Sequence, residues 1–105
     1  MKTLYSVVVP VFNEEGNIEE LYSRLTSVLK KLGLEFEIIF VNDASKDGTE
    51  SIIARLHKKD PIVKLINLSR NFGQQAAVTA GLELARGEVI ITMDADLQDP
   101  PEILP

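Results

Sequence analysis

Two aspartates, Asp94 and Asp96, follow the apolar run from Val89 to Met93 and lie two positions apart. In an extended backbone, residues i and i+2 point to the same side, so the two carboxylates are expected to face one way. Anionic oxygens placed together at the end of a strand suit a divalent cation such as Mg²⁺ or Mn²⁺. A solvated turn is the commoner explanation for a lone Asp-x-Asp pair, so a metal site needs support from elsewhere in the chain.

Polar residues also follow the three other apolar runs that favour strands, which are Leu4 to Val11, Phe36 to Val41 and Ile62 to Leu68. The four polar clusters are Asn13-Glu14-Glu15, Asn42-Asp43, Ser69-Arg70-Asn71 and Asp94-Ala95-Asp96. Helical stretches separate the runs, and this alternation predicts an α/β fold: a Rossmann-like parallel sheet of about four strands with helices on both faces. Because the carboxyl ends of parallel strands share one edge, the clusters are expected to converge on one ligand site.

Local signals predict where the first two helices begin and end. Asn17 and Glu20 resemble a capping box at the start of the first helix, and Gly33 can take the left-handed conformation at its end. Asp47 and Thr49 are expected to cap the second helix.

The third helix, Gln74 to Arg86, is rich in small residues that allow a close approach to the sheet, and Gly87 is expected to stop it. The strand that follows, Val89 to Met93, is expected to be buried because it is continuously apolar. Phe72 is expected to fill the core. His57, the only histidine, is expected to be a solvated helix residue.

Length and composition limit the classes of function. The 105 residues form at most one domain, and the net charge of −5 with no long basic cluster argues against a nucleic-acid-binding surface. No cysteine is present, so thiolate metal sites are excluded. No apolar run approaches the roughly 20 residues of a membrane span, so a cytoplasmic domain is expected.

Several common sites are excluded by their missing motifs. The chain has neither G-x-G-x-x-G nor a P-loop, and no Ser-His-Asp arrangement. An acidic rim remains, in which Asp43 could accept a hydrogen bond from a base or ribose. Asp94 and Asp96 could hold a metal against a diphosphate and so stabilise the charge of a leaving group. These residues predict a transferase that uses a nucleotide-diphosphate donor.

Three segments resemble the motifs of inverting family-two glycosyltransferases with the GT-A fold: residues 8–15, 41–49 and 93–101. The stretch Arg70-Asn71-Phe72-Gly73, with Ala76-Ala77 and Ala80-Gly81, resembles the polyprenyl-phosphate branch, which includes dolichol-phosphate mannose synthases and bacterial undecaprenyl-phosphate sugar transferases. The resemblance implies that residues 1–105 are the N-terminal nucleotide-sugar-binding part of such a domain, without the C-terminal acceptor part.

The resemblance also implies roles for individual residues. The nucleotide-binding residues would be Pro10, Phe12, Glu14, Asp43, Asp94 and Ala95. Asp94 and Asp96 would form the catalytic pair on the donor diphosphate, with Asp94, Asp96 and Gln98 as ligands of Mg²⁺ or Mn²⁺. Arg70 either contacts a phosphate or ties its loop to a neighbouring carboxylate. Asn42 departs from the family pattern, which often has an acid at this position.

The implied reaction is transfer of a sugar from a UDP- or GDP-sugar to a polyprenyl phosphate, with inversion, in a full-length protein at the cytoplasmic face of the membrane. The acceptor oxygen is already anionic, so no strong general base is needed. One alternative is a polysaccharide or cell-wall glycosyltransferase with a sugar acceptor. Another is a noncatalytic fragment that binds nucleotide or forms a homo-oligomer through an open sheet edge.

Overall fold

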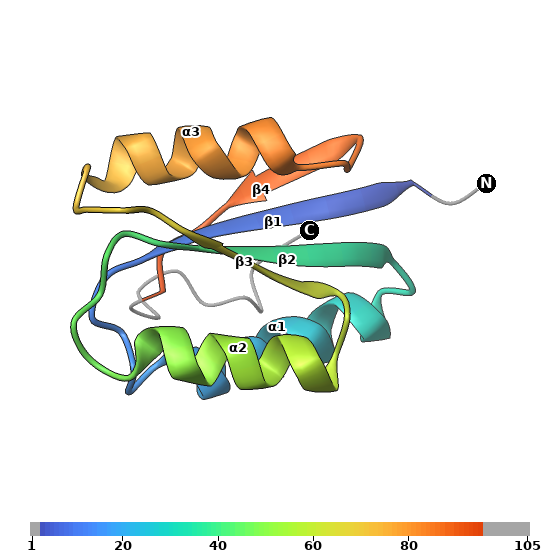
Figure 1. Cartoon of the computed structure of the whole chain (residues 1–105). Coiled ribbons are helices and arrows are strands. Elements are labelled where there is room, and N and C mark those ends of the chain that lie inside the picture. The colour runs from blue at the N-terminus through green and yellow to red at the C-terminus, as the bar shows by residue number, and fades with distance from the viewer. Residues whose placement is uncertain (1–2, 96–105) are drawn as a thin grey trace.

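The computed structural model describes residues 3–95, and these form one parallel sheet with helices on both faces (Figure 1). In chain order the elements are β1 (Leu4–Val11), α1 (Ile18–Lys31), β2 (Glu35–Asn42), α2 (Thr49–Lys59), β3 (Val63–Asn67), α3 (Gln74–Leu84) and β4 (Val89–Thr92). The strand order is β3-β2-β1-β4, and every pairing is parallel. The predicted α/β fold is therefore confirmed.

The alternation of side chains along β1 and β2 divides the core between the two faces of the sheet. On one face, Val7, Val9 and Ile38 pack with residues of α1 and α2, such as Leu25 and Ile53. Figure 1 shows α1 and α2 together on this side and α3 alone on the other. Both faces of the central strands are covered, which explains why their sequences are continuously apolar.

On the other face, α3 lies close to β1 and β2 because its inner surface carries small residues. Ala77 is fully buried there against Val8 and Val41. A Cβ added to Gly81 would clash with the Val8 side chain and lie 3.2 Å from Cγ2 of Val41. The predicted close approach of this helix is confirmed.

The prediction that the fourth strand is buried is wrong. β4 pairs only with β1 within the described residues, so it forms an edge of the sheet. Val89 and Ile90 are 38% and 42% exposed. A continuous apolar run is typical of a strand covered on both faces, and it cannot distinguish that position from an apolar edge.

Gly87 does not stop α3, which ends at Leu84 and is followed by Ala85 in an extended conformation. Gly87 instead lies against β1, where its N–H donates to Oγ of Ser6 at 2.7 Å. A Cβ at this position would lie 2.6 Å from the backbone nitrogen of Ser6 and 2.9 Å from the carbonyl oxygen of Leu4. This close contact between backbones is the structural reason for glycine here.

The helix ends only partly follow the predicted caps. The capping box is absent, since Asn17 makes no side-chain bond to the first turn of α1 and donates instead to Oε2 of Glu14 at 2.8 Å. Gly33 adopts the predicted left-handed conformation, with φ of 71°.

His57 is exposed as predicted, and its ring contacts the carbonyl of Val63. None of the described helices is long and apolar enough to span a membrane.

Candidate functional site

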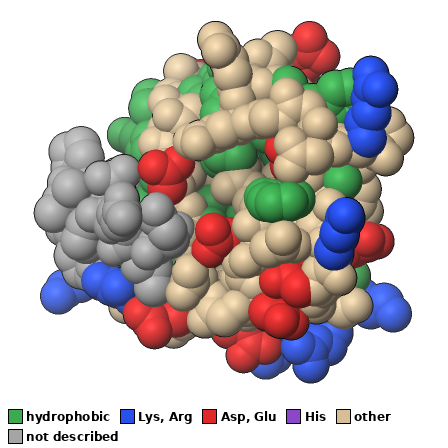
Figure 2. Space-filling model, turned by 90° about the vertical axis from the view of Figure 1, so that its left-hand side faces the viewer, with side chains coloured by type: hydrophobic (Ala, Val, Ile, Leu, Met, Phe, Trp, Pro, Cys, Tyr) green, Lys and Arg blue, Asp and Glu red, His purple; other side chains and the backbone are tan. Residues whose placement is uncertain are grey.

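A cavity of about 380 Å³ lies at the carboxyl edge of the sheet, where β1, β2 and β4 end and α3 begins. Its lining consists of Pro10, Val11, Phe12, Glu14, Asp43, Asn71, Gly73, Gln74, Asp94 and Ala95. All six residues predicted to bind nucleotide are in this set. Figure 2 shows the face of the molecule at this end, with acidic side chains around its centre and basic ones toward its margins. Parallel strands deliver their ends to one edge, which explains the convergence.

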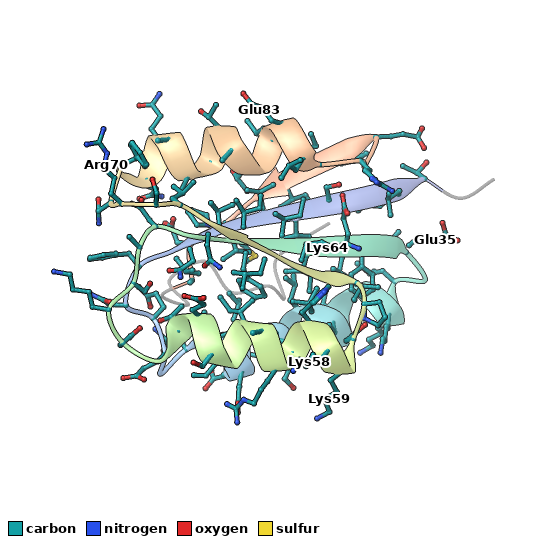
Figure 3. All side chains as sticks on the ribbon, viewed as in Figure 1. Glu35, Lys58, Lys59, Lys64, Arg70 and Glu83 are labelled. Carbon is teal, nitrogen blue, oxygen red and sulfur yellow. The ribbon has the colours of Figure 1, made fainter. Side chains whose placement is uncertain are left out.

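Three further residues were predicted for the site: Asp96, Gln98 and Arg70. Asp96 and Gln98 lie outside the described residues. Arg70 is not part of the cavity lining, although Figure 3 shows it at the end of the molecule where α3 begins.

Asp43, at the end of β2, ties down the loop that precedes α3. Its side chain is only 4% exposed, and Oδ1 accepts the N–H of Phe72 at 2.8 Å while Oδ2 accepts the N–H of Gly73 at 2.9 Å. Gly73 has φ of 97°, which favours glycine, and directly precedes the first residue of α3. Asp43 therefore fixes the start of this helix, whatever it contacts in a ligand.

The prediction that Phe72 fills the core is wrong, because its side chain is 47% exposed. Its backbone N–H is bound to Asp43, and its ring lies under the guanidinium of Arg70, 4.8 Å from centroid to Cζ. This is a cation–π contact on the surface. Within the described residues Arg70 stacks on the ring and forms no bridge to a carboxylate, so the predicted tie to a carboxylate is not found there.

Two loops beside the cavity, residues 12–17 and 43–48, are joined by side-chain to backbone hydrogen bonds. Thr49 Oγ1 accepts the N–H of Glu14 at 2.9 Å, and Oε2 of Glu15 accepts the N–H of Gly48 at 2.9 Å. Asn13, in a left-handed conformation with φ of 53°, accepts the N–H of Lys46 at 2.8 Å. The loop that carries Glu14 is thus held to the loop that follows β2.

The predicted caps of α2 are only partly found: Gly48 is the N-cap residue, Asp47 before it accepts the N–H of Thr49 at 3.0 Å, and Thr49 itself does not cap the helix. The other oxygen of Asp47 accepts the N–H of Glu15 at 3.3 Å. Burial raises the pKa of this carboxyl, but the hydrogen bonds from Thr49 and Glu15 outweigh it, so the pKa of Asp47 lies below its ordinary value.

The contacts of Asn42 explain why this chain has an amide where the family pattern often has an acid. Its side chain is buried, its Oδ1 accepts the N–H of Ser45 at 3.0 Å, and its Nδ2 donates to Oδ1 of Asn67 on β3 at 3.0 Å. An amide can donate and accept at once, whereas an ionised carboxylate can only accept. Asn42 therefore links β2 to both its own turn and the neighbouring strand.

Asp94 is half-buried at the end of β4, and Oδ1 accepts a hydrogen bond from Nε2 of Gln74 at 2.7 Å. Gln74 was not among the predicted site residues. Its position at the first turn of a helix after a loop gives no local signal of this contact, because the partner lies twenty positions further along the chain.

A parallel sheet covered by helices on both faces, with a cavity at the carboxyl ends of its strands, is a Rossmann-like α/β fold. The sequence profile of glycosyl transferase family 2 matches residues 6–105, and the chain belongs to this family. Its fold matches the N-terminal part of GT-A structures.

Two curated relatives are similar over 95% of this chain. They are the glycosyltransferase YkcC of Bacillus subtilis (strain 168), described as uncharacterized, with 51% identity, and the prophage bactoprenol glucosyl transferase homolog of Escherichia coli (strain K12), with 49% identity. The chain spans about a third of their length, 31% and 33% respectively.

Among solved structures, the mannosyltransferase PcManGT of Pyrobaculum calidifontis in complex with GDP-Man and Mn²⁺ superposes with a TM-score of 0.78. The two chains are 29% identical, and the match covers 91% of this chain and 28% of PcManGT.

Proposed function

We propose that residues 1–105 form the donor-binding part of a glycosyltransferase that moves a sugar from a UDP- or GDP-sugar to a polyprenyl phosphate. The observation that carries this proposal is the cavity, which gathers Pro10, Glu14, Asp43 and Asp94 at the end of three strands. Membership of glycosyl transferase family 2 supports a sugar donor, and so does the similarity to PcManGT, whose structure is a complex with GDP-Man and Mn²⁺.

The proposed nucleoside pocket is formed by Pro10, Phe12, Glu14 and Asp43. The ring of Phe12 is exposed beside the cavity and offers an apolar surface for a base, while the carboxylate of Glu14 can accept from a ribose hydroxyl. Each oxygen of Asp43 has a second lone pair after binding the loop, so a further hydrogen bond from the ligand is chemically available.

The diphosphate would lie between Asp94 and the start of α3. Asp43 binds the N–H groups of Phe72 and Gly73, but among residues 3–95 no side chain binds those of the first turn of α3, which together with the positive end of the helix dipole favour an anion. Ala95 is buried next to Asp94 and lines the cavity with it.

A divalent metal fits the donor chemistry of this corner, although the described residues supply only part of a site. No group of three or more His, Cys, Asp or Glu side chains that could hold a metal is found within residues 3–95. Asp94 would be one ligand, with Asp96 and Gln98 as the others, all through hard oxygen atoms. When bound, the metal would neutralise the leaving diphosphate.

In the proposed reaction, an anionic oxygen of the lipid phosphate attacks the anomeric carbon, and the bond from that carbon to the nucleoside diphosphate breaks. Attack opposite the leaving group inverts the configuration. The relative named bactoprenol glucosyl transferase homolog supports a lipid acceptor over a sugar acceptor. This acceptor also implies that the full-length protein works at the cytoplasmic face of a membrane.

Thermal unfolding with UDP, GDP and EDTA tests the proposal. One nucleotide with Mn²⁺ is expected to raise the melting temperature more than the same nucleotide with EDTA, since a ligand at a hundred times its Kd stabilises by about 2.7 kcal/mol. Asp94→Asn is expected to remove much of the Mn²⁺-dependent rise in melting temperature. Glu83→Gln, a change at an exposed position of α3, is expected to keep that rise. Absence of any nucleotide shift in the folded wild type would contradict the proposal.

The exposed edge strand β4 supports a second candidate, self-association of this chain. Val89 and Ile90 are exposed, and β4 has a partner on one side only among the described residues. Light scattering tests this: a monomer at high concentration would exclude it.

A further inference from the structure

The contact between Gln74 and Asp94 joins the first residue of α3 to the end of β4. The distance of 2.7 Å between Nε2 and Oδ1 is at the short end for an N–H···O bond. A carboxylate only accepts, so the amide nitrogen must be the atom that faces it. Gln74 and Asp94, together with Pro10, line both the cavity at the carboxyl edge of the sheet and a second one of about 260 Å³ beside Val78 and Met93.

The position of Gln74 is set by Asp43. The carboxylate of Asp43 binds the N–H groups of Phe72 and Gly73, the two residues directly before Gln74. The helix then begins at Gln74 with its backbone direction fixed. Carboxylates at the ends of β2 and β4 are therefore linked through one short segment, although the two strands are not neighbours in the sheet.

The neighbouring Gln75 shows that the contact is specific to one position. It has the same side chain on the same helical turn and is exposed as Gln74 is, but it makes no side-chain hydrogen bond within residues 3–95. Helix geometry turns consecutive residues by about 100°, so only Gln74 is directed toward Asp94.

A neutral amide donor has a particular effect on this carboxylate. It binds one oxygen and leaves the negative charge in place, whereas a lysine or arginine would neutralise that charge. The second oxygen, Oδ2, stays available for a cation. Hydrogen bonds to a metal ligand of this kind orient it and commonly change metal affinity about tenfold or more when they are removed.

We propose that Gln74 is a positioning residue, which holds the Asp94 carboxylate in one orientation so that its free oxygen meets the metal and diphosphate of the donor. This inference rests on the proposed function, because it assigns Gln74 a role at that same site.

Mn²⁺ alone is the first probe, added to the wild-type chain and to Gln74→Ala, Gln74→Glu and Gln75→Ala. Gln74→Ala is expected to weaken the Mn²⁺ Kd about tenfold. Gln74→Glu keeps the length of the side chain but replaces the donor with a carboxylate that repels Asp94, so in the metal-free variant the amide resonances of Asp94's neighbours should shift. Gln75→Ala should bind as the wild type does. Wild-type affinity in Gln74→Ala would overturn the proposal.

A second readout separates this contact from the proposed function. In the metal-free protein, Asp94→Asn is expected to shift the side-chain amide resonances of Gln74 in a ¹⁵N–¹H spectrum and leave those of Gln75 in place. If the Gln74 resonances do not move, the contact is absent and the inference fails even when nucleotide binds. If they move but the wild type binds neither Mn²⁺ nor nucleotide, the proposed function fails, and the positioning role fails with it.

Discussion

The carboxylate of Asp43 accepts the backbone N–H of Gly73, with 2.9 Å between Oδ2 and the nitrogen, and so joins the end of β2 to the start of α3. Oδ1 of Asp43 also accepts the N–H of Phe72, and together the two bonds hold the loop that forms one wall of the cavity. The site is therefore shaped before a ligand arrives, which is the usual way to lower the entropic cost of binding.

Replacing Asp43 with Asn should loosen this loop. The amide has one acceptor oxygen and would direct a donor at a backbone N–H, so the unfolding free energy is expected to fall by about 2 to 3 kcal/mol. Denaturant unfolding measures the loss, and hydrogen exchange at Phe72 and Gly73 should accelerate. Glu83→Gln removes a charge from an exposed side chain and serves as the control. Equal stability of the two variants would contradict the loop-holding role.

Gly81→Ala should destabilise the protein although alanine favours helices. The new Cβ would clash with Val8 and crowd Val41, and overpacking of this kind costs about 1 to 3 kcal/mol. Removing methyl groups with Val8→Ala should make room, so the double variant is expected to lose less than the sum of the single losses. Additive losses, measured by urea unfolding, would speak against the close contact.

Tyr22 donates a hydrogen bond of 2.6 Å to Oδ2 of Asp60, and the stability that this bond contributes is expected to be lost at alkaline pH. This bond to a carboxylate, followed by burial and the charge of Asp60, raises the pKa of Tyr22 from 10.0 to about 12. The folded state favours the protonated phenol, so its contribution is complete below pH 10 and is lost as pH rises toward 12. The difference in stability between the wild type and Tyr22→Phe should shrink across that window; a constant difference would contradict the assignment.

Asp47 should contribute to stability at neutral pH and not in acid. Its pKa is lowered in the folded state by hydrogen bonds from Thr49 and Glu15, so its contribution is present above the ordinary value of 3.8 and is lost as pH falls through the lower folded value. Asp47→Asn is expected to be less stable than the wild type at pH 7, with a gap that closes below about pH 4. Chemical unfolding at several pH values measures this gap, and a gap that widens in acid would contradict the stabilising role of these hydrogen bonds.

Much of the fold could be predicted because its signals are local. Each apolar run and each helical stripe lies within a few residues, and their alternation leaves few arrangements other than a parallel sheet. Parallel topology brings strand ends to one edge, so the sequence alone was enough to expect Glu14, Asp43 and Asp94 at a common cavity.

The contacts that arrange this cavity could not be predicted in the same way. Asp43 meets Gly73 thirty positions away, and Gln74 meets Asp94 across twenty. These hydrogen bonds depend on strand order and on how closely α3 packs over β1. The exposure of β4 and of the Phe72 ring depends on the same packing. Residue type and spacing indicate which groups reach the edge of the sheet, but a hydrogen-bond partner depends on distances of a few ångströms that arise only when the layers pack.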